Sequence, residues 1–201
     1  MKNNLEILGT QTIEGGKYSS IDVLGKLIVL NDVSIEDLDV LGSATFNGNV
    51  ESQTVDILGN CEIKESIKAK NIEILGIANI DGNIEADSIE IIGIANVKGD
   101  LSADSFECLS GSSTFNNIYG EDISFDYRKY KNKHVKIETS NDVKRIANTI
   151  EATNITLSHI KVNKVSGKNI EILNNVEIDL LEYSGSLTLS RGAKIKKIVK
   201  F

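Results

Sequence analysis

Residues 71–104 decide the fold, because they read as two matching lines. Residues 71–87 are NIEILGIANIDGNIEAD, and residues 88–104 are SIEIIGIANVKGDLSAD. The two lines are identical at ten of seventeen positions. A repeat of this length indicates a supersecondary unit that stacks on copies of itself.

Corner glycines extend this period along the first half of the chain, at Gly25, Gly42, Gly59, Gly76 and Gly93. Within each period the apolar residues come in pairs two positions apart, which is the alternation of a strand with one buried face. The pairs are separated by Gly, Asn and Asp, which favour turns. Each period therefore predicts three short strands joined by tight corners.

Stacked periods align the apolar positions in columns at the strand spacing of about 4.8 Å. The sequence thus predicts an all-β fold, a single-stranded parallel β-helix with three sides, about 17 residues per turn and about eleven turns. The usual handedness of parallel connections makes it right-handed. An α-helical fold is a poor alternative, because no 3.6-residue periodicity survives and β-branched residues dominate.

The repeat is regular in the first part of the chain and then breaks. We expect an acidic β-helix over residues 1–126, a phase break with a basic segment over 127–150, and basic β-helix turns over 151–201. The last part either continues the first part or stacks on it. Its spacing groups Ile155 with Ile172 and Leu189 in one column. A second column groups Ile160, Ile178 and Ile195.

Charge is distributed unevenly, although the total is −7. Residues 1–126 contain 7 Lys+Arg and 22 Asp+Glu, a net charge of −15, whereas residues 127–201 contain 15 and 7, a net charge of +8. A rod with an acidic end and a basic end attracts copies of itself end to end. The alternative is that the two halves simply differ in surface composition.

Neither end of the predicted rod has an obvious cap, although solenoids usually protect their open edges. We expect exposed apolar residues in the end turns, where they would form the polymerisation surface. Fraying and cover by side chains are the alternative. The residues concerned are Leu5, Ile7, Leu187, Leu189, Ile195, Ile198 and Phe201.

One outward position of each period carries a carboxylate, which predicts an acidic row along one face. The row has three interpretations: a solvated face that prevents lateral stacking, a docking face for the Lys-rich residues 161–168 or 194–200 of a neighbour, or a metal site. Hard cations need convergent ligands, so the metal site fits least well. The row consists of Asp22, Asp39, Asp56, Glu73, Glu90 and Glu107.

The sequence lacks the constellations of an enzyme. His134 and His159 have no carboxylate at a convincing offset, so we expect both on the surface or in loops. No GxxxxGK[ST] phosphate loop and no zinc-spaced Cys/His cluster occurs. Residues 128–136 are basic, but an exposed loop explains them better than a nucleic-acid or lipid contact. We therefore expect no catalysis, cofactor, metal, nucleotide or nucleic acid.

Cysteine usage and the N-terminal residues indicate a cytoplasmic protein. Cys61 and Cys108 occupy inward columns, as expected of free thiols in a reducing compartment. The opening MKNNLEILG lacks the basic region and apolar run of a signal peptide, and no apolar stretch reaches transmembrane length. Any membrane association would therefore not use an N-terminal anchor.

The pattern Ile-Glu-Ile-Leu-Gly-x-Ala-x-Ile-x-Gly-x-Ile-x-Ala of residues 72–86 resembles the bactofilins. Residues 169–173 (NIEIL) and 192–195 (GAKI) resemble the C-terminal part of longer, two-part bactofilin-like proteins of Gram-positive bacteria. Unlike typical bactofilins, this chain has almost no tails around the repeats.

This resemblance implies a right-handed β-helix and a bacterial cytoskeletal protein that polymerises without a nucleotide. The chain itself and a paralogue are the candidate partners. The alternative function is a non-polymerising β-helix scaffold or binding module that uses a flat face.

Overall fold

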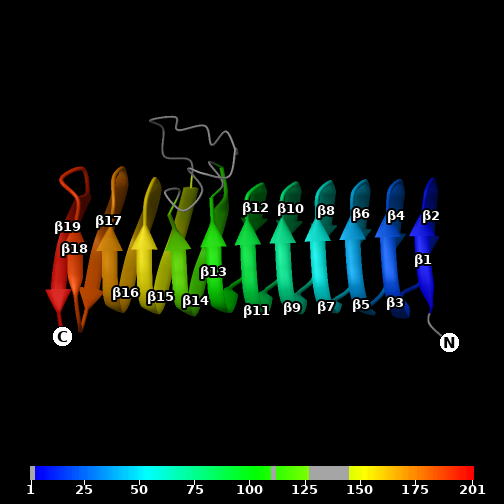
Figure 1. Cartoon of the computed structure of the whole chain (residues 1–201), viewed down its shortest axis with the longest axis horizontal. Coiled ribbons are helices and arrows are strands. Elements are labelled where there is room, and N and C mark those ends of the chain that lie inside the picture. Colours follow the sequence, from blue (N-terminus) through cyan, green and yellow to red (C-terminus); the bar gives the residue numbers. More distant parts are fainter. Residues whose placement is uncertain (1–2, 110–111, 127–144) are drawn as a thin grey trace.

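The structure, a computed structural model, describes residues 3–109, 112–126 and 145–201. These residues form parallel strands and no helix, stacked as a β-solenoid of about ten turns with about 17 residues per turn. The predicted all-β parallel β-helix is therefore confirmed. The chain winds into a rod with its two termini at opposite ends (Figure 1).

Each regular turn contains one short strand and one long strand. The long strand β11 (Ile84–Ile91) buries two pairs of side chains, Ile84 with Ala86 and Ile89 with Ile91. The alternation is interrupted between the pairs, where Asp87 takes no part in the pairing with the next turn. The strand therefore covers two sides of the rod, and the prediction of three separate strands per turn is wrong in this respect.

The first strand of the rod is the four-residue β1 (Asn4–Ile7), which stacks on the long strand of the next turn. The other four-residue strands stack on one another and form the remaining side of the rod: β2 (Thr10–Ile13), β4 (Lys26–Val29), β6 (Ser43–Phe46), β8 (Asn60–Ile63), β10 (Ile77–Ile80) and β12 (Ile94–Val97). The eight-residue strands are β3 (Gly16–Val23), β5 (Val33–Val40), β7 (Val50–Ile57), β9 (Ile67–Ile74), β11, β13 (Leu101–Cys108) and β17 (Val176–Tyr183). The remaining strands are β14 (Thr114–Phe125), β15 (Arg145–Leu157), β16 (Ile160–Ile172), β18 (Leu187–Leu189) and β19 (Lys194–Lys200).

The core is a set of continuous apolar columns, as the period predicts. Leu38, Val55, Ile72, Ile89 and Phe106, for example, are partners in successive turns and are almost completely buried. Burying such side chains stabilises the fold by roughly 1.5–3 kcal/mol each, before the entropy of ordering the chain is subtracted.

The corner glycines are required by close contact between turns. The amide of Gly59 donates to the carbonyl of Val40 at 2.8 Å. A Cβ atom on Gly59 would lie 2.0 Å from the carbonyl oxygen of Gly42, one turn below. Because that oxygen belongs to the backbone, no side-chain rotation could relieve the clash.

The turns between β15, β16 and β17 are shorter than the period of seventeen, whereas the last turn keeps it and pairs Ile172 with Leu189 and Ile178 with Ile195, as predicted. Ile155 pairs with Ile170, and Leu157 pairs with Ile172, at offsets of fifteen residues. Ile160 pairs with Val176. The predicted grouping of Ile155 with Ile172, and of Ile160 with Ile178, is therefore wrong. Corners that lose one residue each explain the change, because β15 and β16 run on where the first half has a turn.

The stacking continues across residues 127–144, which lie outside the described residues together with the basic segment predicted there. Phe125 at the end of β14 pairs with Leu157 at the end of β15. The two strands share ten residue pairs. Because β14 pairs directly with β15, the described rod has about ten turns and not eleven.

Candidate assembly surfaces

At the C-terminal end of the rod the last turn leaves apolar side chains in water. β18 pairs only with β16, and β19 pairs only with β17, so each has an open edge. Ile198 is 45% exposed and Phe201 is 69% exposed. Leu189 is also exposed, whereas Leu187 and Ile195 are half-buried. These are the predicted end-turn residues, and the structure brings them together on one end.

The N-terminal end is partly covered. β1 pairs only with β3, and β2 pairs only with β4, so this end also has an open edge. Leu5 is half-buried, but Ile7 is only 1% exposed because its side chain packs into the core. The expectation that Ile7 is exposed is therefore wrong. Ile13 in β2 is half-buried and belongs to the same end.

The two ends carry matching columns. Leu5 and Leu187 are the first and last members of one inward column, and Ile7 and Leu189 are the first and last members of the next. Ile13 and Ile195 likewise terminate a column on the short-strand side. A second copy placed on the end would therefore extend apolar columns with apolar residues.

Charges near the C-terminal end are partly neutralised within the chain. Lys194 lies 2.9 Å from a carboxylate oxygen of Glu177, and Lys196 lies 2.8 Å from one of Asp179. Both lysines are more than three-quarters exposed, so each pair contributes little to stability. They stay accessible to a further carboxylate.

The acidic row forms as the sequence predicts. Its six carboxylates are partners in consecutive turns, and Glu6 in β1 adds a seventh because it pairs with Asp22. Sequence reasoning missed Glu6, because the first turn is sixteen residues long and not seventeen. The row ends after Glu107, which pairs with Ser124.

Within the row, the proton affinity of Asp39 is raised. Burial raises the pKa of the Asp39 carboxyl above its ordinary value, and the neighbouring carboxylates of Asp56 and Asp22 raise it further. Like charges directly opposite in a sheet are destabilising, typically by a few tenths of a kcal/mol to about 1 kcal/mol. The repulsion between Asp39 and its neighbours Asp22 and Asp56 is therefore one that a nearby cation would relieve.

A second surface feature was not predicted. The residue before each corner glycine is apolar and points outward, and we name this set the leucine ridge. Its first five members are between 44% and 72% exposed, and Ile92 is half-buried. The signal was present in the sequence as a leucine or isoleucine before each glycine. The leucine ridge consists of Leu8, Leu24, Leu41, Leu58, Leu75 and Ile92.

An interior polar cluster lies where β14 meets β15. Arg145 is 3% exposed, and its guanidinium donates from Nε to the carbonyl of His159 at 2.9 Å and from Nη1 to the carbonyl of Cys108 at 3.1 Å. Its Cζ lies 5.7 Å from the ring centroid of Phe125. Burial lowers the pKa of the Arg145 guanidinium. We assign this cluster a structural role, because the arginine donates hydrogen bonds to backbone carbonyls of two different turns.

His159 lies at the edge of this cluster and is half-buried, whereas His134 lies outside the described residues. Burial lowers the pKa of the His159 imidazole, and the charge of Arg145 lowers it further. The part of the chain that the structure describes contains no group of three or more His, Cys, Asp and Glu residues that could hold a metal ion.

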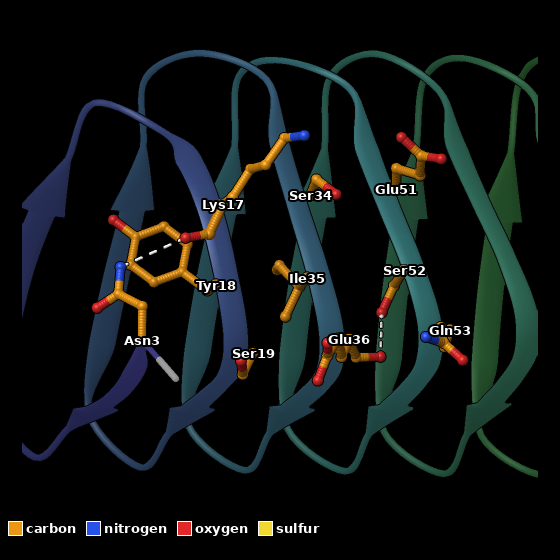
Figure 2. A pocket seen from close by; sticks show the side chains of 10 residues that line it. All are labelled: Asn3, Lys17, Tyr18, Ser19, Ser34, Ile35, Glu36, Glu51, Ser52 and Gln53. Atoms are coloured by element: carbon orange, nitrogen blue, oxygen red, sulfur yellow. Dashed lines mark hydrogen bonds between the residues drawn. The ribbon is translucent and has the colours of Figure 1, made fainter. Parts of the chain in front are cut away.

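A shallow pocket of about 390 Å³ lies near the N-terminal end (Figure 2). Its walls come from successive turns, with Lys17 and Tyr18 beside Ser34 and Ile35, and these beside Ser52. The Ser52 hydroxyl lies 2.8 Å from the carbonyl of Thr54, so it is engaged with the backbone. The lining residues do not form a nucleophile–base pair, and the pocket supports no catalytic assignment.

Comparisons with known proteins identify the family. The family model that matches is Bactofilin, described as polymer-forming cytoskeletal, over residues 18–116. Neither the search of curated proteins nor that of solved structures gave a significant match. Within the described residues, no helix has the length and apolar character needed to cross a membrane. The matched residues contain most of the regular turns, most of the acidic row and most of the leucine ridge, so residues 18–116 are the part of the chain that matches the bactofilin family.

Proposed function

We propose that this protein is a structural subunit that assembles end to end into filaments through its terminal β-helix turns, without a nucleotide. The observation that carries the proposal is the pair of open ends with matching apolar columns. An open parallel edge presents unpaired N–H and C=O groups, which another strand can satisfy. The family description as polymer-forming cytoskeletal agrees with this function.

The register supports a head-to-tail contact. Continuing the columns by one turn would stack Leu187 on Leu5 of the next copy, and Leu189 on its Ile7. Thr188, which faces outward in the same strand, would then lie beside Glu6 of the next copy. All strand pairs described in the chain are parallel, and a head-to-tail contact keeps that direction.

Charge supports the same polarity. The division into an acidic part (residues 1–126) and a basic part (residues 151–201) brings opposite charges together at each head-to-tail contact. One turn of extended register would bring Glu14 of the next copy near Lys196. Such contacts act mainly on the rate of encounter and weaken as salt is added.

The protein is proposed to work in the cytoplasm and without catalysis. Neither Cys61 nor Cys108 forms a disulfide and both are buried, which suits a reducing compartment. Burial raises the pKa of the Cys61 thiol to about 12, so this group does not serve as a nucleophile. The partner of the subunit is another copy of itself, with a paralogue as a second candidate.

Negative-stain electron microscopy without nucleotide tests this function, with Ile198→Asp and a control variant. Ile198 (45% exposed) lies in the last turn, and Ile146 (49% exposed) lies on the side of the rod. We expect filaments from the wild type and from Ile146→Asp, and single rods from Ile198→Asp. Filaments should shorten between about 0.05 M and 0.5 M salt. Single rods from the wild type at every concentration would reject end-to-end assembly.

A further inference from the structure

The acidic row and the leucine ridge run side by side over the same turns. Each ridge residue follows a row residue by two positions, as Leu41 follows Asp39 and Leu58 follows Asp56. The ridge residue lies in the corner directly after the strand that carries the row residue, as Leu41 follows the end of β5 and Leu58 the end of β7, so the two columns are neighbours at one edge of the rod, about 7 Å apart along the chain. The two features therefore make one surface, which we name the acid–leucine face.

The ridge is a continuous stack. The amide of Leu41 donates to the carbonyl of Val23, the residue before Leu24, and the amide of Leu58 donates to the carbonyl of Val40, the residue before Leu41. The same contact recurs at Leu75. Each ridge side chain therefore lies one turn, about 4.8 Å, from the next.

The face ends where both of its components end. After Ile92 the next ridge position is Leu109, which is buried, and the position in the following turn is Asp126, which is also buried. The acidic row gives way to Ser124 at the same level of the rod. The ridge thus ends at Ile92 and the row one turn later at Glu107, so the two outward features cover nearly the same turns. This overlap indicates one binding surface, because the core imposes no such limit on outward side chains.

Other outward positions do not repeat in this way. The residue directly after the corner glycine is Lys26, Ser43, Asn60 or Ile77 in successive turns. The position before the glycine is nevertheless leucine in five turns and isoleucine in the sixth, although each of these side chains leaves apolar surface in water. Contiguous exposed apolar rows with a polar border mark interaction sites on soluble proteins.

We propose that the acid–leucine face binds a basic amphipathic α-helix of a partner protein, with the apolar stripe of that helix on the leucine ridge and its Lys and Arg side chains on the acidic row. Charge complementarity identifies the occupant, because a cationic border relieves the repulsion within the row. A second copy of this chain fits poorly, since equal acidic rows would repel one another.

Spacing favours a helix over an extended segment. Side chains on one face of a helix recur about every 5.4 Å along its axis, close to the 4.8 Å of the ridge, whereas those of a strand recur about every 6.6 Å. The ridge from Leu8 to Ile92 spans about 24 Å, which corresponds to about sixteen helical residues. Helices of this kind bind through apolar anchors at i, i+3, i+4 and i+7.

The test measures fluorescence anisotropy of a labelled eighteen-residue peptide that carries a Leu stripe flanked by Lys. A scrambled peptide of the same composition, without the stripe, is the peptide control. We expect the striped peptide to bind in the micromolar range and Leu41→Ser/Leu58→Ser to weaken it at least about tenfold. Asp56→Asn/Glu73→Gln should also weaken binding and reduce its salt dependence.

Matched variants on other faces serve as protein controls. Ile146→Ser removes an equally exposed apolar side chain, and Glu51→Gln removes an exposed carboxylate of another face, so both should bind as the wild type does. Equal binding of the scrambled peptide, or unchanged binding by Leu41→Ser/Leu58→Ser, would overturn the proposal. So would flotation of the protein with phosphatidylcholine vesicles that Leu41→Ser/Leu58→Ser abolishes, because the ridge would then be a membrane contact.

This inference is independent of end-to-end assembly. The acid–leucine face lies along the side of the rod, so Leu41→Ser/Leu58→Ser should form filaments like those of the wild type. Conversely, Ile198→Asp should bind the peptide unchanged as single rods. Loss of peptide binding and loss of filament formation can therefore be observed independently of one another.

Discussion

The guanidinium of Arg145 donates a hydrogen bond to the backbone carbonyl of Cys108, inside the β-helix and across 37 positions of sequence. A second bond reaches the carbonyl of His159. The arginine thus joins the turns on both sides of residues 127–144. A charged group in such a place depends on these contacts, because an unpaired buried charge is strongly destabilising.

We predict that Arg145→Ala destabilises the fold by about 2–4 kcal/mol, because it leaves two buried carbonyls without their donor and opens a cavity. Arg191→Ala, at an exposed position, should change stability by less than about 0.5 kcal/mol. Urea unfolding followed by circular dichroism measures both, in the Ile198→Asp background so that assembly does not contribute. Equal unfolding midpoints would contradict the role of Arg145.

The burial of Arg145 is a feature that could not be predicted from the sequence. Arginine is rarely buried, so composition places Arg145 on the surface, whereas in the fold it pairs with Ile160 of β16 and bonds to the Cys108 carbonyl inside the rod. By contrast, the columns from Ile21 to Phe106 follow from the sequence alone, because the turns there all have seventeen residues. Leu38, Val55 and Ile72 occupy the predicted column without exception.

Between β15 and β16, the assumption of a constant period of seventeen residues predicted the wrong strand partners. A turn of fifteen residues moves the partner of Ile155 from Ile172 to Ile170, and a one-residue change at a corner leaves no mark in composition. Alternation within a strand survives such changes, so the fold class was predictable while the register was not. The leucine ridge was missed for another reason: exposed and buried leucines look alike in sequence.

Corner geometry makes a second prediction. Gly59→Ala should destabilise the rod by more than about 3 kcal/mol, because the new Cβ would lie 2.0 Å from the Gly42 oxygen. Gly9→Ala is the matched control from the first turn, where a Cβ would have nothing within 4 Å, and it should change stability by less than about 0.5 kcal/mol. Thermal unfolding of both variants in the monomeric background decides the matter. Similar melting temperatures would show that the corners can open.

The acidic row predicts that replacing Asp39 by a neutral residue stabilises the fold at pH 7 but not at pH 3. Asp39 has a raised pKa in the folded state, so its ionised form opposes folding above that pKa, and the penalty disappears below the unfolded value of 3.8, where the carboxyl is protonated in both states. Asp39→Asn should therefore raise the melting temperature at pH 7 by about 1–3 °C. The gain should vanish near pH 3.

Glu65→Gln, an exposed carboxylate outside the row, is the control for that gain and should have little effect at either pH. Added salt should reduce the advantage of Asp39→Asn, because screening weakens the repulsion in the wild type. A melting temperature that falls at pH 7 in Asp39→Asn would mean that a bound cation or hydrogen bonds already compensate the row.

Disulfide cross-linking tests head-to-tail assembly most directly. Thr188 and Glu6 are both exposed, and the continued register would make them neighbours in adjacent copies. Strand neighbours lie about 5 Å apart, within the range that a disulfide spans. Cys61 and Cys108 are fully buried and should not interfere.

We predict that the double variant Glu6→Cys/Thr188→Cys, oxidised under assembly conditions, gives a ladder of covalent dimers, trimers and longer chains on a denaturing gel. Each single variant should remain monomeric, because a head-to-tail contact places unlike ends together. Covalent dimers from Glu6→Cys alone or Thr188→Cys alone would show that like ends meet. A double variant that stays monomeric while filaments form would contradict the end-turn interface itself.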